Sequence, residues 1–240
     1  DFYVSLNPCR PEVRSYLVGL FREIVRKYPV DGLHLDYIRF PNESSPRGSD
    51  YPYDAQTLAL YRRATGKRPR DDKAAWSRWR TEQVTQLVRE AREVTRGAGR
   101  TVRLTTACGT DFTRWRTDHF QDGPGWLRSR LVDLVFVMNY QRNTNVFRQR
   151  QLAWYNAAPG AWVAPGLGVY EHASPSVTIE QLRLAERWGH GFGLFSAGNL
   201  FSAQARSHLE AVRPTLLSMQ RGPTALRSDD DETARLAAAR

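Results

Sequence analysis

The chain has 240 residues, a formal net charge of +10 and 41% hydrophobic residues. This length is enough for one sizeable hydrophobic core and is compatible with a single α/β barrel. No run of about 18 apolar residues is present, so no membrane-spanning helix is expected, and no N-terminal signal pattern is seen. The chain opens on the strand-like segment DFYVSLNP without an initiator Met, which predicts a fragment or a processed product.

The basic residues are mostly Arg, and a basic surface attracts anionic partners such as nucleic acid or an acidic glycan. The alternative is that these charges are simply spread along the helices. No Lys/Arg block and no nucleic-acid-binding motif is found, so no nucleic-acid partner is expected. Cys9 and Cys108 make neither a metal-binding spacing nor a disulfide framework. We therefore expect two semi-buried thiols and no metal or cofactor.

The first predicted element is a helix over residues 11–28, where apolar side chains recur every three or four positions. Pro11 suits the first helical position, and the segment VDGLHLD (30–36) then predicts a strand. Residues 42–73 are rich in Pro, Gly, Ser and Asp. They predict a long loop with one helical turn near 54–64, and loops of this length are usually functional or disordered.

Predicted helices and strands alternate along the rest of the chain. They are a helix at 74–97, a strand at 101–108, a loop at 110–126, a strand at 131–140, a helix at 144–157, a strand at 161–170, a helix at 177–188, a strand at 191–199 and a helix at 202–217. Near-continuous apolar strands that alternate with helices are typical of βα units with a parallel sheet buried on both faces. Residues 1–217 are predicted to form one domain, and residues 218–240 a polar, disordered tail.

Polar residues stand where the predicted strands end. They are Asp36, Cys108, Asn139 with Tyr140, Tyr170 with Glu171, and Ser196 with Asn199. In α/β barrels and in open parallel sheets alike, the functional site lies at the carboxyl ends of the strands. No metal cluster, phosphate-binding loop or serine-nucleophile elbow is found. Carboxylates, phenols and many tryptophans remain, and this chemistry suits glycoside hydrolysis.

Asp36 is the leading catalytic candidate. It ends a strand that we expect to be buried, where burial would raise the pKa of its carboxyl group, as a general acid requires. The alternative is an Asp held by Arg39, Arg80 or a backbone turn. His34 lies two residues earlier, and we expect it to point to the same side. It either orients Asp36, or bonds a sugar, or is a satisfied core histidine.

Five further residues are candidate substrate contacts. Tyr37 and Arg39 follow the strand end, where a sugar hydroxyl or carboxylate could be met. Trp115 and Trp126 fall in the predicted loop and could stack on the apolar faces of sugars. Asp122 is placed equally well in the site or as the cap of a following helix.

The segment NPCRPEVRSYLVGLFREIVRKYPVDGLHLDYIRFP resembles the glycosyl hydrolase-like 10 family of bacterial barrels. The resemblance continues in WRTEQVTQLV (79–88), QDGPGWLRSRLVDLVFVMNY (121–140), GLGVY (166–170) and GFGLFSAGNLF (191–201). It implies a (β/α)8 TIM-type barrel that is matched from its fourth strand onward, so the first three strands are absent. DGLHLDYIR also resembles, faintly, the chitinase strand motif, but Ile38 stands where the chitinase acid would be.

The resemblance also implies a function. It implies a glycosidase that acts on a bacterial cell-wall or surface polysaccharide containing amino sugars, in an exported or envelope-associated, lipoprotein-like protein. It makes Asn139 and Tyr140 pocket-lining residues; the alternative is that they close hydrogen bonds between strand ends. Tyr170 is a further contact candidate. Glu171 follows it at the tip of a predicted strand and is a candidate second carboxylate, although the family resemblance does not extend to it. Two other functions stay open: a non-catalytic glycan-binding or inactive truncated barrel, and a basic nucleic-acid-binding protein.

Overall fold

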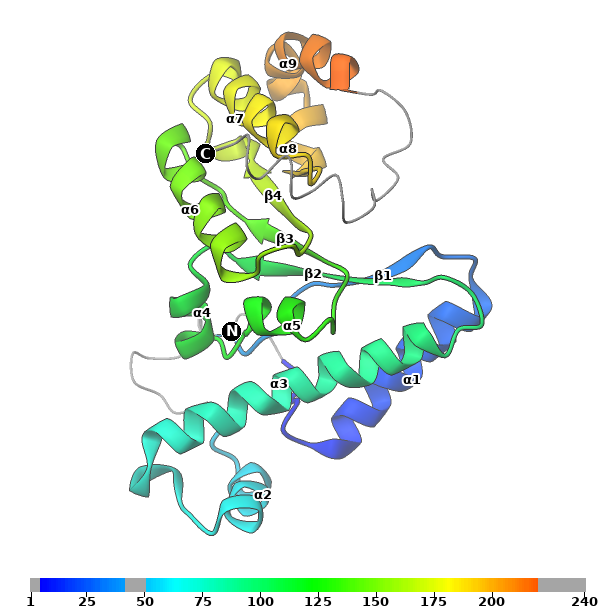
Figure 1. Cartoon of the computed structure of the whole chain (residues 1–240), viewed down its shortest axis with the longest axis vertical. Coiled ribbons are helices and arrows are strands. Elements are labelled where there is room, and N and C mark those ends of the chain that lie inside the picture. Colours follow the sequence, from blue (N-terminus) through cyan, green and yellow to red (C-terminus); the bar gives the residue numbers. More distant parts are fainter. Residues whose placement is uncertain (1–4, 42–50, 220–240) are drawn as a thin grey trace. The chain divides into compact units, whose positions relative to one another are not determined.

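The computed structural model describes residues 5–41 and 51–219 (Figure 1). The chain forms two compact units, which we describe separately. Unit 1 comprises residues 1–107 and 111–133, and unit 2 comprises residues 108–110 and 134–240. Strands and helices alternate in both, and within each unit the strands pair in chain order and in parallel. This mixed α/β arrangement is compatible with part of a TIM-type barrel.

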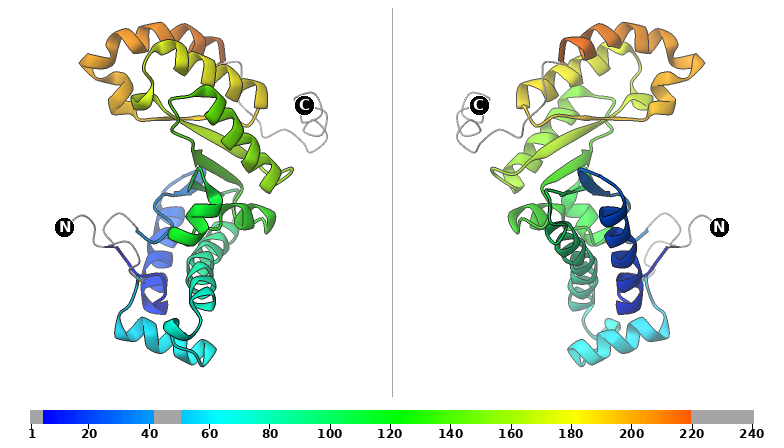
Figure 2. Two further views of the ribbon diagram at one scale, coloured as in Figure 1. Left: turned by 90° about the vertical axis from the view of Figure 1, so that its left-hand side faces the viewer. Right: turned by 90° about the vertical axis from the view of Figure 1, so that its right-hand side faces the viewer.

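Unit 1 pairs two strands and packs them against helices. Its elements are α1 (Pro11–Lys27), β1 (Gly32–Leu35), α2 (Ala55–Thr65), the 3-10 turn η1 (Pro69–Asp71), α3 (Lys73–Arg96), β2 (Arg103–Gly109, whose last two residues belong to unit 2), α4 (Phe112–Asp118) and α5 (Gly123–Arg128). Strand β1 pairs with β2 from Gly32 opposite Arg103 to Leu35 opposite Thr106. Helices α1 and α3 lie side by side (Figures 1 and 2).

The predicted helix over 11–28 is confirmed as α1, and Pro11 occupies its first turn. The helical turn predicted near 54–64 within the long loop over 42–73 is confirmed as α2, which is a longer helix of 11 residues, and the 3-10 turn η1 follows it. Asp54 caps α2 by accepting a hydrogen bond from the Thr57 backbone N–H at 3.0 Å, and Gly66 ends the helix in the left-handed conformation. Residues 42–50 of that predicted loop lie outside the described residues.

The core of unit 1 gathers aromatic side chains of α2 and α3. Trp76 stacks on Trp79 with 5.3 Å between ring centroids, and Tyr61 packs edge-on against both rings. Trp76 and Tyr61 are fully buried. These tryptophans therefore stabilise the fold, because ring pairs at such distances add to the gain from burying apolar surface.

Unit 2 contains three parallel strands and the helices that follow them. Its elements are β3 (Leu134–Met138), α6 (Thr144–Ala157), β4 (Val163–Gly168), η2 (Val169–Glu171), α7 (Pro175–Trp188), β5 (Gly193–Phe195), α8 (Ala197–Phe201), η3 (Ala203–Ala205) and α9 (Arg206–Met219). Strand β4 pairs with β3 on one side and with β5 on the other, and all its residues are buried. A cluster of buried side chains on α6, β4, α7 and α9 forms the core: Phe147, Leu167, Leu182, Leu184 and Val212.

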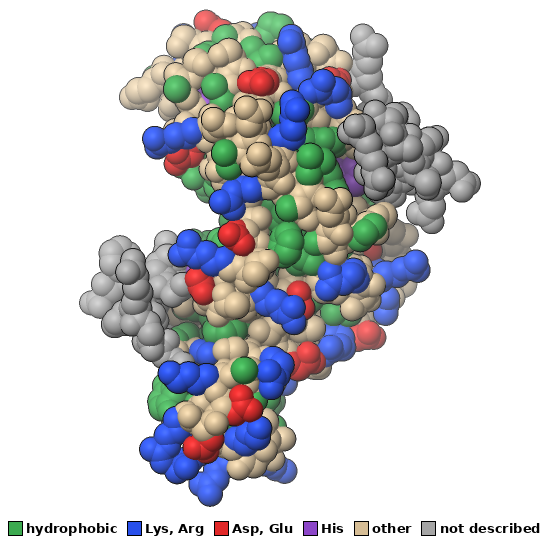
Figure 3. All heavy atoms as spheres, turned by 60° about the vertical axis from the view of Figure 1, so that its left-hand side comes forward, with side chains coloured by type: hydrophobic (Ala, Val, Ile, Leu, Met, Phe, Trp, Pro, Cys, Tyr) green, Lys and Arg blue, Asp and Glu red, His purple; other side chains and the backbone are tan. Residues whose placement is uncertain are grey.

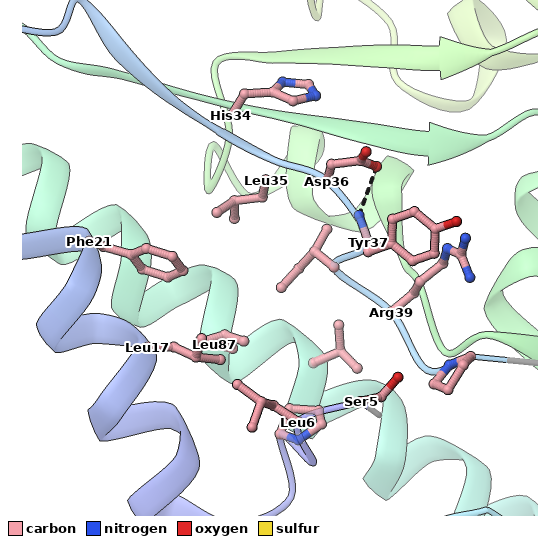
Figure 4. Close-up of a pocket in the computed structure, with 14 residues that line it drawn as sticks. Ser5, Leu6, Leu17, Phe21, His34, Leu35, Asp36, Tyr37, Arg39 and Leu87 are labelled. Atoms are coloured by element: carbon pink, nitrogen blue, oxygen red, sulfur yellow. Dashed lines mark hydrogen bonds between the residues drawn. The ribbon is translucent and has the colours of Figure 1, made fainter. Parts of the chain in front are cut away.

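The expectation of strands buried on both faces holds for β4 but not for β1 or β3. In β1 the side chains of Leu33 and Leu35 are buried, whereas His34 is exposed. Strand β3 alternates in the same way between buried and half-buried residues. The physical reason in β1 is that Leu35 packs toward α1 and α3, while His34 points away from them (Figure 4).

Cys9 and Cys108 are both buried and are not joined in a disulfide, and burial raises the pKa of the Cys9 thiol to about 12. Among the helices of residues 5–41 and 51–219, none has the length and apolar character needed to cross a membrane. On the face drawn in Figure 3, Lys and Arg side chains are interspersed with Asp and Glu. The basic charge is therefore spread over this face rather than gathered in one block.

His190 gives unit 2 a predicted pH dependence. Its Nδ1 accepts a hydrogen bond from the Val163 backbone N–H at 3.1 Å, and its ring packs on Tyr155 and Trp162. Burial lowers the pKa of His190 to about 4. The unfolded chain therefore binds a proton more readily than the folded one, and the free energy of unfolding is greatest above about pH 6.5 and falls as the pH drops toward 4.

We expect His190 to account for a loss of about 2 kcal/mol between pH 7.5 and pH 5. Urea unfolding at both pH values measures it. Burial also lowers the pKa of His172 and of His208, so His190→Gln is the matched variant: it loses the titrating ring but keeps an acceptor. An equal pH dependence in His190→Gln and the wild type would contradict this assignment.

Candidate functional site

A cavity of about 460 Å³ lies in unit 1 beside β1. Its floor is apolar and its rim is polar (Figure 4). The lining residues come from the segment before α1, from α1 and α3, and from β1 with the segment after it: Ser5, Leu6, Pro8, Leu17, Phe21, His34, Leu35, Asp36, Tyr37, Ile38, Arg39, Pro41, Val84 and Leu87. The volume is that of a small-molecule or single-sugar site.

The pleat of β1 brings the two catalytic candidates to one side. In a strand successive side chains point to opposite faces, so Leu33 and Leu35 are buried at 8% and 6% exposure. His34 and Asp36 are exposed on the other face. Figure 4 shows Leu35 directed toward Phe21, with His34 and Asp36 directed away from it. The prediction that His34 and Asp36 point to the same side is confirmed.

His34 is tied to the neighbouring strand. Its Nδ1 lies 2.8 Å from Thr105 Oγ1 on β2. Partial shielding from water lowers the pKa of His34, and the negative charge of Asp36 offsets part of this effect. The imidazole is therefore neutral at pH 7, with one nitrogen fixed by the threonine hydroxyl. A neutral ring in this position can orient a ligand or exchange a proton with it.

Asp36 differs from its prediction in burial. The side chain is exposed, so the expected burial of its carboxyl group is wrong. Its Oδ1 accepts a hydrogen bond from the Tyr37 backbone N–H at 2.8 Å, which is the backbone-turn alternative. Arg80 is placed elsewhere: it donates to the Tyr51 carbonyl at 2.7 Å and lies over the ring of Phe120.

Tyr37, Arg39 and Trp115 form a stacked group at the rim. Tyr37 has a left-handed backbone with φ of 54° and is 54% exposed. The guanidinium carbon of Arg39 lies 4.2 Å from the centroid of the Tyr37 ring and 4.9 Å from that of Trp115. Non-glycine residues with positive φ are strained and are held in place by surrounding structure, often at functional sites. The structure thus brings together three of the predicted contact residues.

The group is anchored by two residues that sequence reasoning missed. The Phe40 backbone N–H donates to the carbonyl of His119 at 3.0 Å, and His119 Nδ1 lies 3.0 Å from the Phe40 carbonyl. The buried amide of Gln121 donates to the carbonyls of Ala107 and Ile38. These contacts join segments far apart in the sequence, and no periodic pattern marks them.

Two of the predicted contacts in the 110–126 segment need correction. Trp115 and Trp126 lie in the short helices α4 and α5, not in a loop. Trp126 is 1% exposed and donates to Thr85 Oγ1 at 2.9 Å, so its ring has no face to offer a sugar. Asp122 caps α5 by accepting from the Gly125 backbone N–H at 3.2 Å, which is its structural alternative.

Unit 2 carries an aromatic group of its own at the carboxyl ends of its strands. The ring of Tyr140 stacks on Phe195 with centroids 5.2 Å apart, and Tyr170 meets both rings edge-on. Tyr170 and Phe195 are 48% and 51% exposed. Phe195 was not among the predicted site residues, because only the polar residues at this strand end, Ser196 and Asn199, were considered. Tyr170 lies in η2 rather than at the tip of β4.

The other two candidates of unit 2 are already bonded to protein groups. Asn139 is fully buried; its amide accepts from Thr110 Oγ1 at 3.1 Å and donates to the Phe147 carbonyl at 2.9 Å. Its expected contact with substrate is therefore corrected in favour of the structural alternative. Glu171 pairs with Arg142, with Oε2 and Nε 2.5 Å apart.

Gly168 makes room for Tyr140. A Cβ atom at Gly168 would lie 2.6 Å from the Cβ of Tyr140, which is closer than carbon atoms can approach. We expect Gly168→Ala to lower the free energy of unfolding by about 1–3 kcal/mol through overpacking, as measured by urea unfolding. Gly198→Ala is the control, since a Cβ there meets nothing closer than 3.9 Å. Equal stability of the two variants would contradict the prediction.

A sequence profile described as glycosyl hydrolase-like 10 matches residues 2–158. The chain belongs to this family. The matched range contains the whole cavity lining, together with Trp115 and Tyr140. Tyr170, Glu171 and Phe195 lie beyond it, as do the segments GLGVY and GFGLFSAGNLF. No curated protein matches the chain.

Carboxylates matter in a chain of the glycosyl hydrolase-like 10 family, because glycoside hydrolysis generally uses a pair of them. Among the described residues that line the cavity, Asp36 is the one carboxylate. The same described part of the chain has no group of three or more His, Cys, Asp and Glu side chains that could hold a metal ion.

Proposed function

We propose that the chain hydrolyses glycosidic bonds in a bacterial cell-wall or surface polysaccharide that contains amino sugars. The observation that carries this proposal is the placement of Asp36 and His34 on the exposed face of β1, at the rim of a sugar-sized cavity, in a glycosyl hydrolase-like 10 chain. The proposal places the protein outside the cell or in the cell envelope, where a basic surface suits polyanionic polymers.

Asp36 has the central role in the proposed reaction, as nucleophile or as acid/base. Its exposure leaves the second carboxylate oxygen accessible to a ligand, while Oδ1 is held by the Tyr37 N–H. The absence of burial removes the argument for a general acid, so the nucleophile and base roles have the stronger support. His34, held by Thr105, would orient the sugar beside it.

Exposed aromatic rings support a sugar ligand in each unit. Tyr37 in unit 1 and Tyr170 and Phe195 in unit 2 are exposed, and the half-buried rings of Trp115 and Tyr140 lie beside them. The apolar faces of pyranose rings pack on such rings, and the phenol groups of tyrosine can bond sugar hydroxyls. These residues are proposed as substrate contacts.

A second candidate function is glycan binding without turnover. It is favoured by the single carboxylate among the described lining residues, because both retaining and inverting hydrolysis generally need two carboxyl groups. The two functions differ in one observable: only the hydrolase releases new reducing ends.

A reducing-end release assay tests the proposed function. The substrates are peptidoglycan strands with and without peptides, and glucosamine polymers that are fully or partly N-acetylated. Release by the wild type and its loss in Asp36→Asn would support hydrolysis at Asp36. Equal release by both proteins would reject Asp36 as the catalytic group. No release, but saturable binding of one polymer, would favour the second candidate function.

A further inference from the structure

We propose that Thr178 and His172 position the aromatic group of unit 2, and that this group keeps its arrangement at neutral pH and loses it in acid. The group consists of Tyr140, Tyr170 and Phe195, whose ring centroids lie 5.2 to 6.2 Å apart. Thr178 is fully buried, and His172 is 9% exposed. That the group contacts a glycan rests on the proposed function, whereas the way in which the group is held does not.

Helix α7 holds the segment that carries Tyr170. Thr178 Oγ1, on α7, lies 2.7 Å from Nδ1 of His172, and His172 follows Tyr170 by two residues. The His172 backbone N–H donates to the Val169 carbonyl at 3.3 Å and so closes the turn η2. The position of Tyr170 within η2 therefore depends on the bond between the histidine and the threonine.

The same helix holds the segment that carries Tyr140. Gln181 lies one turn after Thr178, is fully buried, and donates to the carbonyl of Gln141 at 2.8 Å. Gln141 is the residue next to Tyr140. Two buried polar side chains of α7 thus fix the two chain segments whose tyrosine rings meet.

The Thr178 hydroxyl also links two histidines. Its Oγ1 lies 2.9 Å from Nε2 of His208 on α9, which packs against α7 (Figures 1 and 2). A hydroxyl group has one proton to donate and two lone pairs that accept. While both rings are neutral, one ring accepts the hydroxyl proton and the other donates its N–H to the hydroxyl oxygen, so all three groups are satisfied.

Two charged rings cannot share this hydroxyl. A charged imidazole carries a proton on each nitrogen, so both rings would donate to Thr178 Oγ1 and the hydroxyl proton would lose its ring acceptor. Two positive charges would also face one oxygen in a buried place, which is costly. One charged ring can still be accommodated, because the other ring then accepts the hydroxyl proton.

Burial keeps His172 neutral at pH 7. It lowers the pKa of the ring, and the neighbouring His208 lowers this pKa further; Gln181 and the negative charge of Glu171 offset part of the effect. Burial also lowers the pKa of His208. The charged groups that act on His172 are thus His208 from α9 and Glu171 from η2, and Glu171 is itself paired with Arg142.

Acid therefore breaks the bridge in a stated order. His208 is the more exposed of the two histidines and takes up the first proton. As the pH falls further below the usual histidine value of about 6.5, His172 takes up the second and leaves Thr178. The turn η2 is then released, and Tyr170 moves away from the other two rings.

Nuclear Overhauser cross-peaks in the full chain measure this arrangement without a ligand. We expect cross-peaks from the ring protons of Tyr170 to those of Tyr140 and Phe195 at pH 7.5, and their loss as the pH is lowered to about 4.5. The cross-peaks between Tyr61 and Trp76, in the core of unit 1, serve as the reference and should remain.

Three variants separate the bridge from other effects of acid. Thr178→Ser keeps the hydroxyl and should behave like the wild type, whereas Thr178→Val has a similar shape without it and should show weakened Tyr170 cross-peaks already at pH 7.5. His190→Gln removes another buried histidine of unit 2 and should leave the transition unchanged.

His208→Gln is the decisive variant if Thr178→Val does not fold, because His208 is only partly buried. The glutamine amide offers Thr178 both a donor and an acceptor but cannot be charged. A charged His172 then still finds a satisfied hydroxyl. We expect the Tyr170 cross-peaks of His208→Gln to persist at the pH at which the wild type has lost them.

The inference would be overturned by wild-type cross-peaks that persist to about pH 4.5, or by their loss together with those of Tyr61 and Trp76. A loss in His208→Gln at the same pH as in the wild type would also overturn it. The proposed function fails differently: this transition in a protein that releases no reducing ends would support the inference and reject hydrolysis.

Discussion

Replacing Asp36 with Asn is expected to lower kcat for hydrolysis of the polysaccharide substrate by about 10²- to 10⁴-fold, which is the range for loss of an acid/base group. The substitution keeps the shape of the side chain and an oxygen that can accept a hydrogen bond from the Tyr37 backbone N–H. In the wild type this N–H lies 2.8 Å from Asp36 Oδ1. The substitution removes the negative charge and the basic or nucleophilic oxygen. The loss should therefore fall on kcat, with glycan binding retained.

Asp31→Asn is the matched control for this measurement. Asp31 is exposed and precedes β1, at the end opposite to Asp36, and its carbonyl accepts from the Arg103 backbone N–H at 2.9 Å. Its activity should equal that of the wild type within about twofold, because no charge near the cavity changes. Parallel losses in both variants would show that the assay reports folding rather than chemistry at Asp36.

Asp133→Ala is expected to lower the free energy of unfolding by about 3 kcal/mol, since it leaves the partners of a part-buried carboxylate unpaired. Asp133 accepts two hydrogen bonds from Arg92, both at 2.7 Å, and a third from the Leu104 backbone N–H at 2.7 Å. It thereby joins α3, β2 and the end of unit 1. Urea unfolding of the purified variant gives the measurement.

Asp118→Ala removes a carboxylate of a surface pair and serves as the comparison. Asp118 bonds Arg114 at 3.1 Å, and the Arg114 side chain is 74% exposed. Exposed pairs contribute about 0.5 kcal/mol or less. If Asp118→Ala and Asp133→Ala were equally stable, the network around Asp133 would not be a major source of the stability of unit 1.

Periodicity predicted the long helices well, because their buried side chains recur every three or four residues. It missed the short helices α4 and α5, and it extended the strand β5 into residues that form α8. Helix α1 and helix α6 lie within one residue of their predicted limits. Within the segment 42–73 the helical turn near 54–64 was predicted too short, because the Pro, Gly and Asp residues around it were taken as loop formers. Asp54 and Gly66 instead begin and end α2, so the same residue types that break helices also delimit them.

The candidate site was predicted in part. The alternation in β1 is local, and it placed His34 and Asp36 on one face correctly. The stack of Arg39 on Trp115 joins two segments that are distant in the sequence, and neither segment contains a pattern that predicts this contact. Trp126 looked like a loop residue among glycines and a proline, but packing against α3 buries it. The local sequence thus indicated candidate residues, but their roles depend on tertiary contacts that the sequence pattern does not show.

Strand β1 and the residue after it contribute both to the hydrophobic core and to the candidate site, and this restricts which sequence changes the strand can accept. Leu33 and Leu35 belong to the packed interior, while His34 and Asp36 face the cavity rim. Inserting one residue after Gly32 would exchange the two faces, burying the polar pair against α1 and α3. Point substitutions can therefore change the site alone. Insertions or deletions within the strand would disrupt the packing of the core and the placement of the site residues together. A library that diversifies this region should hold its length constant.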